Sequence, residues 1–175
     1  DLKTAASFAQ KKKIMTLIDS TFASPINQKP IEFGIDAVIH SATKYLGGHS
    51  DIIGGGISGS AEFISRSTET MKLLGGCADP HQAFMLERGL KTLSARMRIH
   101  NENACKIAEF LESEPGIERV IYPSLESHEQ HRLALDQMSG FGGIVSVDLG
   151  TESRAIKFAD SLKAFQNAVS LGGVE

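Results

Sequence analysis

Short apolar runs alternate with segments of helical spacing along the first part of the chain. Residues 14–18 and 37–39 are apolar runs, a pattern typical of strands that are covered on both faces. Residues 5–13 and 61–74 have the character of helices, and the glycine-rich segment 52–59 is expected to form a further strand. This alternation predicts an α/β unit with buried strands.

A long helix, or a pair of helices, is predicted between residues 80 and 113. Asp79 is a favourable N-cap and Pro80 suits the first helical position. The apolar residues then keep a mostly helical spacing as far as about Glu112. A helical segment of this length can connect two domains.

Shorter elements are expected after this connection. Residues 117–123 and 143–149 read as strands joined by a polar, His-rich connection, and residues 152–165 have the pattern of an amphipathic helix. Residues 24–30 are expected to be a loop, because they contain two prolines and several polar residues. The chain is therefore predicted to be α/β up to about residue 113 and to begin a smaller α+β unit at residue 114.

Composition excludes several classes of protein without choosing one. Hydrophobic residues make up 41% and charged residues 22% of the 175 residues, and the net charge of −3 gives no reason to expect nucleic acid or an anionic membrane as a partner. No apolar run approaches the roughly 18–20 residues that span a bilayer. The two cysteines, Cys77 and Cys105, have no CxxC spacing, so we expect reduced thiols in a cytoplasmic protein rather than a disulfide framework or a zinc site.

The segment 41–51 contains the strongest chemical signal. It places Lys44 directly after an apolar run and next to two hydroxyl residues, Ser41 and Thr43. Asp19 ends the earlier apolar run, and Thr21 follows it two residues later. Taken singly, these are a surface lysine, loop-capping hydroxyls and a turn-forming aspartate. Together they provide an amine for a Schiff base, hydroxyls for a phosphate and a desolvated carboxylate for a ring nitrogen, which is what pyridoxal phosphate (PLP) requires.

Six ordered motifs resemble one family of PLP enzymes over essentially the whole chain. The sequence is similar to the Cys/Met-metabolism enzymes, the group of cystathionine γ-synthase, cystathionine γ-lyase, cystathionine β-lyase and methionine γ-lyase. The motifs lie at residues 18–22, 41–51, 87–93, 122–131, 140–143 and 170–175.

The resemblance implies a role for each candidate residue. Lys44 corresponds to the lysine that forms the Schiff base and moves protons, and Asp19 to the partner of the pyridine nitrogen. Ser41 and Thr43 correspond to phosphate contacts, Thr21 lies beside the ring, and Glu175 corresponds to a glutamate near the substrate entrance. No metal site is implied. One departure is Ser20, where the family usually has Asn, and another is Ala37, where a larger apolar residue is usual.

The same resemblance implies an architecture and an activity. Residues 1–113 would be the C-terminal part of the PLP-binding large domain of a fold-type I transferase, with a mostly parallel sheet, helices on both faces and a connecting helix at about 80–113. Residues 114–175 would begin the small C-terminal domain. The full-length protein is expected to be a homotetramer, a dimer of dimers, that acts on a sulfur amino acid in cysteine and methionine metabolism. We favour γ-elimination of cystathionine, with γ-replacement on an O-activated homoserine or cleavage of methionine as alternatives.

Family members are more than twice as long as this chain, so the resemblance also implies missing parts. The ring-stacking tyrosine, the glycine-rich phosphate turn, the residues lent by a neighbouring subunit and the carboxylate-binding serine and arginine would all lie outside these 175 residues. We therefore expect the segment alone not to be a competent enzyme. A non-catalytic fragment or pseudoenzyme that keeps the fold is the alternative from another class.

Two weaker signals point elsewhere. Residues 54–59 satisfy the G-x-G-x-x-G spacing of a dinucleotide site, but no clear strand precedes them and no helix opens within them. His128 and His131 lack the spacing and the third ligand of a metal site. We expect a close-packed glycine strand and a polar loop.

Overall fold

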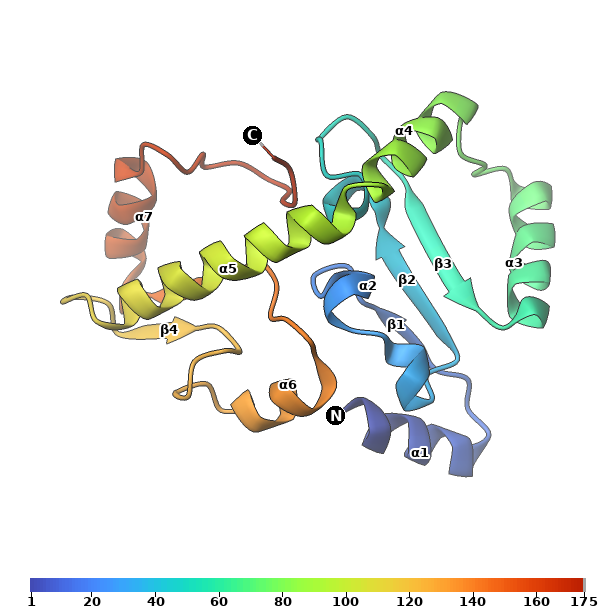
Figure 1. Cartoon of the computed structure of the whole chain (residues 1–175), viewed down its shortest axis with the longest axis horizontal. Coiled ribbons are helices and arrows are strands. Elements are labelled where there is room, and N and C mark those ends of the chain that lie inside the picture. The colour runs from blue at the N-terminus through green and yellow to red at the C-terminus, as the bar shows by residue number, and fades with distance from the viewer. Residues whose placement is uncertain (175) are drawn as a thin grey trace.

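The computed structural model describes residues 1–174 and contains two small sheets connected by one long helix (Figure 1). The helices and strands, in chain order, are α1 (Leu2–Lys12), β1 (Leu17–Asp19), α2 (Ser24–Asn27), the 3-10 turn η1 (Pro30–Phe33), β2 (Ala37–Ser41), the π-type turn η2 (Ala42–Leu46), β3 (Gly55–Gly59), α3 (Ala61–Leu74), α4 (Pro80–Leu90), α5 (Leu93–Glu112), β4 (Arg119–Ile121), α6 (His131–Gln137), β5 (Ser146–Asp148) and α7 (Glu152–Ser161).

The first sheet has the order β1-β2-β3 and is mixed. β1 and β2 are parallel, with Asp19 opposite Ile39, whereas β2 and β3 are antiparallel, with Ser41 opposite Gly55. The expectation of a mostly parallel sheet is therefore not met by these three strands. The connection between β2 and β3 contains only η2 and no crossover helix, so β3 returns antiparallel to β2.

The apolar run 14–18 is a shorter and more exposed strand than the sequence predicts. β1 begins only at Leu17, whose surface is 54% exposed, and Ile14 and Met15 are exposed as well. α1 ends at Lys12, and the following residue, Lys13, adopts a left-handed backbone conformation, so residues 14–16 connect the helix to the sheet. β1 is also an edge strand of the described sheet, and about half of the Leu17 surface stays uncovered.

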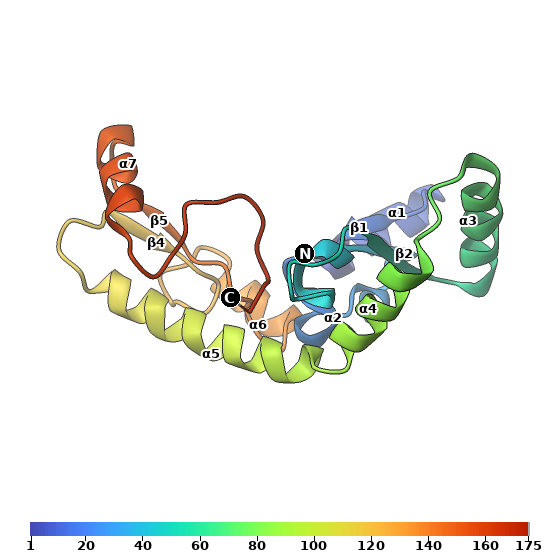
Figure 2. The same cartoon turned by 90° about the horizontal axis from the view of Figure 1, so that it is seen from above.

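The predicted helical segment 80–113 is a pair of helices, α4 and α5, that meet at Lys91 and Thr92. Asp79 caps α4 as expected, because its carboxylate accepts hydrogen bonds from the backbone N–H groups of His81 and Gln82. α5 contacts α2 and η2 near its first half and β4 near its far end, so it connects the two sheets (Figure 2). No helix among residues 1–174 is both long and apolar enough to cross a membrane.

The second sheet pairs β4 with β5 in antiparallel register and packs on α5. Tyr122 is fully buried there, beside Ala104 and Ala108 of α5. The sequence predicts both strands but not α6, which lies in the polar connection, nor the short α2 in the predicted loop. α7 stops at Ser161 rather than Phe165, because Leu162 leaves the helical conformation.

Candidate PLP site

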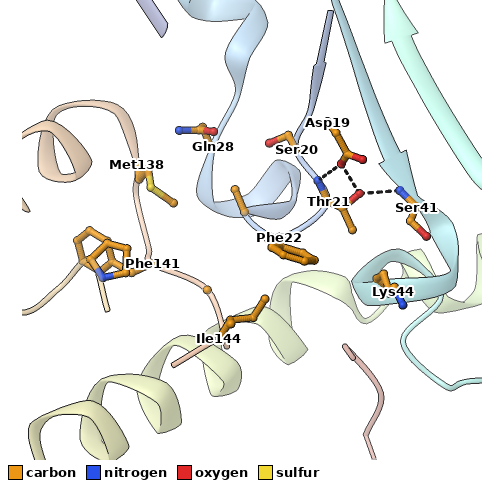
Figure 3. Close-up of a pocket in the computed structure, with 13 residues that line it drawn as sticks. Asp19, Ser20, Thr21, Phe22, Gln28, Ser41, Lys44, Met138, Phe141 and Ile144 are labelled. Atoms are coloured by element: carbon orange, nitrogen blue, oxygen red, sulfur yellow. Dashed lines mark hydrogen bonds between the residues drawn. The ribbon is translucent and has the colours of Figure 1, made fainter. Parts of the chain in front are cut away.

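The Lys44 side chain projects from a single turn at the carboxyl end of β2 (Figure 3). The turn is closed by the Gly47 N–H group, which donates to the carbonyl of Ala42 at 2.8 Å. The backbone at Lys44 leaves the helical region inside this turn, with φ −92° and ψ −130°. Lys44 is half-buried, and its Nζ donates to Ser170 Oγ at 2.7 Å.

A chain of hydrogen bonds connects the carboxyl ends of β1 and β2. The Ser41 N–H group donates to Thr21 Oγ1 at 2.8 Å, and the Thr21 hydroxyl donates in turn to Asp19 Oδ1 at 2.5 Å. The Thr21 N–H group also donates to Asp19 Oδ1, at 2.9 Å. These contacts, drawn as dashed lines in Figure 3, fix the Asp19 carboxylate at the end of the parallel strand pair.

Asp19 is exposed in the described chain, whereas the sequence suggests a buried carboxylate. The hydrogen bond from the Thr21 hydroxyl, followed by that from the Thr21 backbone, lowers the pKa of Asp19 below its ordinary value. The carboxylate is therefore kept ionised by hydrogen bonding rather than changed by desolvation. It is exposed because it faces an open cavity.

This cavity brings together four of the six residues selected from the sequence: Asp19, Thr21, Ser41 and Lys44. Its volume is about 630 Å³, within the usual range for a small-molecule site. The opposite wall comes from the second half of the chain and is formed by Pro123, Met138, Phe141, Gly142 and Ile144 (Figure 3).

The other two selected residues do not line the cavity in the described structure. Thr43 exchanges hydrogen bonds with the backbone of Gly54: it accepts from the N–H group at 3.1 Å and donates to the carbonyl at 3.5 Å. Glu175 lies outside the described residues.

Sequence reasoning assigned no role to Ser170, although it lies in one of the matched motifs. Ser170 has a left-handed backbone conformation, with φ +81°, and reaches Lys44 from 126 positions away. Gly172 also lies against the lysine turn, since a Cβ added to it would be 2.7 Å from the backbone nitrogen of Tyr45. The unusual φ of Ser170 has no signal in the sequence.

The two weaker sequence signals occupy ordinary structure. Residues 55–59 are the strand β3, so they do not form the strand–turn–helix of a dinucleotide site. His131 Nδ1 lies 2.9 Å from the carbonyl of Pro123, and His128 Nδ1 accepts from the Gln130 N–H group. Within residues 1–174, no group of three or more His, Cys, Asp or Glu side chains is arranged to hold a metal ion.

Comparison with known proteins identifies the family. The model of the family described as "Cys/Met metabolism PLP-dependent enzyme" matches residues 1–175. The chain belongs to this family. The resemblance seen in the sequence motifs is therefore confirmed.

The relatives of the chain carry three different reaction names. A cystathionine β-lyase of Lactococcus lactis subsp. cremoris and the cystathionine γ-lyase of Bacillus subtilis are 44% and 43% identical to it, and the match covers all of this chain and 46% of each relative. The crystal structure of cystathionine γ-synthase from Xanthomonas oryzae pv. oryzae, in complex with aminoacrylate and cysteine, superposes with a TM-score of 0.96 at 43% identity and 46% coverage of that chain. The chain thus spans about half the length of these relatives.

The residues around the cavity fit the cofactor of this family. An amine, two hydroxyls and an ionised carboxylate surround one space at the carboxyl ends of two neighbouring parallel strands, which is where α/β sheets bind ligands. These groups are the partners that an aldehyde, a phosphate ester and a pyridine nitrogen require.

Proposed function

We propose that the protein containing this chain is a PLP-dependent transsulfuration enzyme that cleaves or forms a carbon–sulfur bond. The observation that supports this most directly is the cavity that Lys44 lines together with the hydrogen-bonded set Asp19–Thr21–Ser41. Membership of a PLP-dependent family gives this arrangement its chemical meaning.

Each residue of the chain has a distinct task in this proposal. Asp19, ionised because of its hydrogen bonds to Thr21, keeps a proton on the pyridine nitrogen. Ser41 donates to the phosphate, and Thr43 does so if its hydroxyl turns from the carbonyl of Gly54. When bound, the cofactor supplies an electron sink for negative charge at the substrate Cα.

Lys44 has two tasks. Its Nζ would hold the cofactor covalently in the resting protein, and once free the Lys44 amine would move protons at the substrate. The hydroxyl of Ser170 keeps the freed amine at the cavity, 2.7 Å away. Glu175, which lies outside the described residues, is proposed to lie near the substrate entrance.

The proposed reaction is γ-elimination of cystathionine, which releases cysteine. The relatives named for chemistry at the γ position include both lyases and synthases, so γ-replacement on an O-activated homoserine is the main alternative. Cleavage at the β position is the third, because β-lyases are equally similar. We also propose that residues 1–113 and 114–175 belong to a large and a small domain, and that the full-length protein is a cytoplasmic homotetramer.

A product assay on the full-length protein tests both the class and the reaction. With cystathionine, γ-elimination yields cysteine, 2-oxobutanoate and ammonia, whereas β-elimination yields homocysteine, pyruvate and ammonia. Cysteine with an O-activated homoserine tests replacement, and methionine alone tests the methionine γ-lyase reaction. No turnover in any arm by cofactor-loaded protein would favour the non-catalytic alternative.

The variant Lys44→Ala should lower turnover by at least about 10²–10⁴-fold, because it removes the group that moves the proton. Lys91→Ala is the matched control, since Lys91 follows the end of α4, is 69% exposed and forms its described ion pair with Glu87. Retention of full activity by Lys44→Ala would show that the role given to Lys44 is wrong.

A further inference from the structure

Arg96 is a buried cation whose described partners are all uncharged oxygen atoms. It lies on α5 and is only 8% exposed. Its Nη1 donates to the carbonyl of Tyr45 at 2.7 Å and its Nη2 to the carbonyl of Gly89 at 2.8 Å. Its Nε donates to Thr92 Oγ1 at 3.0 Å.

These contacts join the ends of two helical segments. Tyr45 is in the last part of η2, and Gly89 is in the last turn of α4. The final carbonyls of a helix lack an N–H partner in the next helical turn and carry partial negative charge. A cation is therefore favourable at the carboxyl end of each of these two segments. The planar guanidinium can serve both carbonyls at once because its donors have a fixed fork geometry.

The space around Arg96 is closed by glycines. A Cβ at Gly48 would collide with the guanidinium, and a Cβ at Gly89 would collide with the carbonyl oxygen of Gly47. Arg96 and α4 therefore lie directly against the backbone of the lysine turn. A buried charge is costly unless its hydrogen bonds are made, so this arrangement has little freedom to shift.

The backbone of Tyr45, the residue after Lys44, is held on both sides. Arg96 holds the carbonyl of Tyr45, while Gly172 packs against its backbone nitrogen. Because Lys44 immediately precedes Tyr45, fixing Tyr45 on both sides restricts where the lysine side chain can point.

We propose that Arg96 is a positioning residue that fixes η2 and thereby holds Lys44 at the cavity. The proposal rests on the function proposed for Lys44. It assigns Arg96 no contact with substrate or cofactor. Displacement of a reacting group by about 1 Å costs on the order of 100-fold in rate, so loss of the guanidinium should be visible in the chemistry of Lys44.

The test measures how fast Lys44 binds the cofactor covalently in the full-length protein. The protein is stripped of cofactor and mixed with PLP, and samples are quenched with borohydride, which converts the link to a stable amine. The labelled Lys44 peptide is then quantified by mass spectrometry, and total bound PLP is measured separately by equilibrium dialysis. The variants are Arg96→Met, Arg96→Lys and Thr92→Val. The last removes the acceptor of Arg96 Nε together with the hydroxyl that donates to the carbonyl of Gly89 at 3.2 Å, and leaves the guanidinium in place.

Arg98→Gln is the matched control, because Arg98 lies two residues further along α5, is 66% exposed and pairs with Glu102. We expect Arg96→Met to slow linkage by about 10–100-fold while the folded protein still binds PLP. Arg96→Lys and Thr92→Val should give intermediate linkage rates. In Arg96→Lys a single ammonium cannot reproduce the fork geometry of the guanidinium, and in Thr92→Val a misoriented guanidinium keeps only part of its hydrogen bonds. Arg98→Gln should react at the unmodified rate.

A purely structural role for Arg96 would lower thermal stability and total PLP binding together without changing the linkage rate of the folded fraction. That result, or unchanged rates in all three variants, would overturn the proposal. If Arg96→Met does not fold, the other two variants decide by the same measurement. Absence of label at Lys44 in the unmodified protein would instead overturn the proposed function, and the Arg96 proposal with it.

Discussion

Replacing Gly89 by alanine should destabilise the protein, although alanine is the better helix former. The substitution gains at most about 1 kcal/mol of helix propensity. The added Cβ, however, would lie 2.9 Å from the carbonyl oxygen of Leu46 and even closer to that of Gly47, whereas ordinary contacts begin at 3.4 Å. The Leu46 contact alone requires α4 and the lysine turn to separate by about 0.5 Å, and the closer Gly47 contact requires more.

The obstacle at Gly89 is backbone, so no side chain can rotate to relieve the overlap. Overpacking of this kind costs about 1–3 kcal/mol, and the rigid neighbour places the cost at the upper end. The net loss is about 2 kcal/mol, which lowers the thermal midpoint of a unit of 150–250 residues by about 4–8 °C and that of the longer, full-length protein by less.

Thermal unfolding of the cofactor-loaded, full-length protein measures this shift. Ser94→Ala is the control for helix propensity, since Ser94 is exposed near the start of α5 and should be neutral or slightly stabilising. A Gly89→Ala variant that is as stable as the unmodified protein would show that α4 and the lysine turn are not in close backbone contact, and the reasoning would be refuted.

Three further outcomes are expected. Tyr122→Phe removes the buried hydroxyl that donates to the carbonyl of Gly142 at 2.8 Å and should cost about 1–3 kcal/mol in urea unfolding; an unchanged midpoint would contradict this. Asn101→Ala breaks the two amide hydrogen bonds with Asn27 and the one from the Gly142 N–H group, so it should cost about 2–4 kcal/mol and speed proteolysis after residue 138. Burial lowers the pKa of His40 below 6.5, so the unfolded chain binds more protons and the free energy of unfolding should fall as pH drops below about 6.5. His40→Gln should reduce the difference between the urea midpoints measured at pH 7 and at pH 5, and an equally large difference in the variant would rule out this cause.

Local patterns in the sequence predict the elements that carry the lysine. The apolar run before Ser41 forms β2, and Asp79 with Pro80 starts α4 as expected. These predictions succeed because strand periodicity and helix capping depend on residues close together in sequence.

The remaining features depend on residues far apart in sequence. Arg96 has the appearance of an ordinary surface cation on a helix, and only the arrival of η2 and α4 buries it. The Asp19 carboxylate was expected to be buried, but the strand-end position makes it face a cavity. Neither the left-handed backbone of Ser170 nor its approach to Lys44 can be read from local composition.

The contact between Lys44 and Ser170 has a consequence for biosynthesis. Because 126 positions separate the two residues, a ribosome that adds about 5–20 residues per second makes Lys44 roughly 6–25 s before Ser170 exists. Closing a loop of this length also costs about 4 kcal/mol of chain entropy, so the contact forms only when the packing around it can offset that cost. During this interval the lysine amine of the nascent chain has no serine to hold it, and this contact can form only as the last part of the described chain arrives.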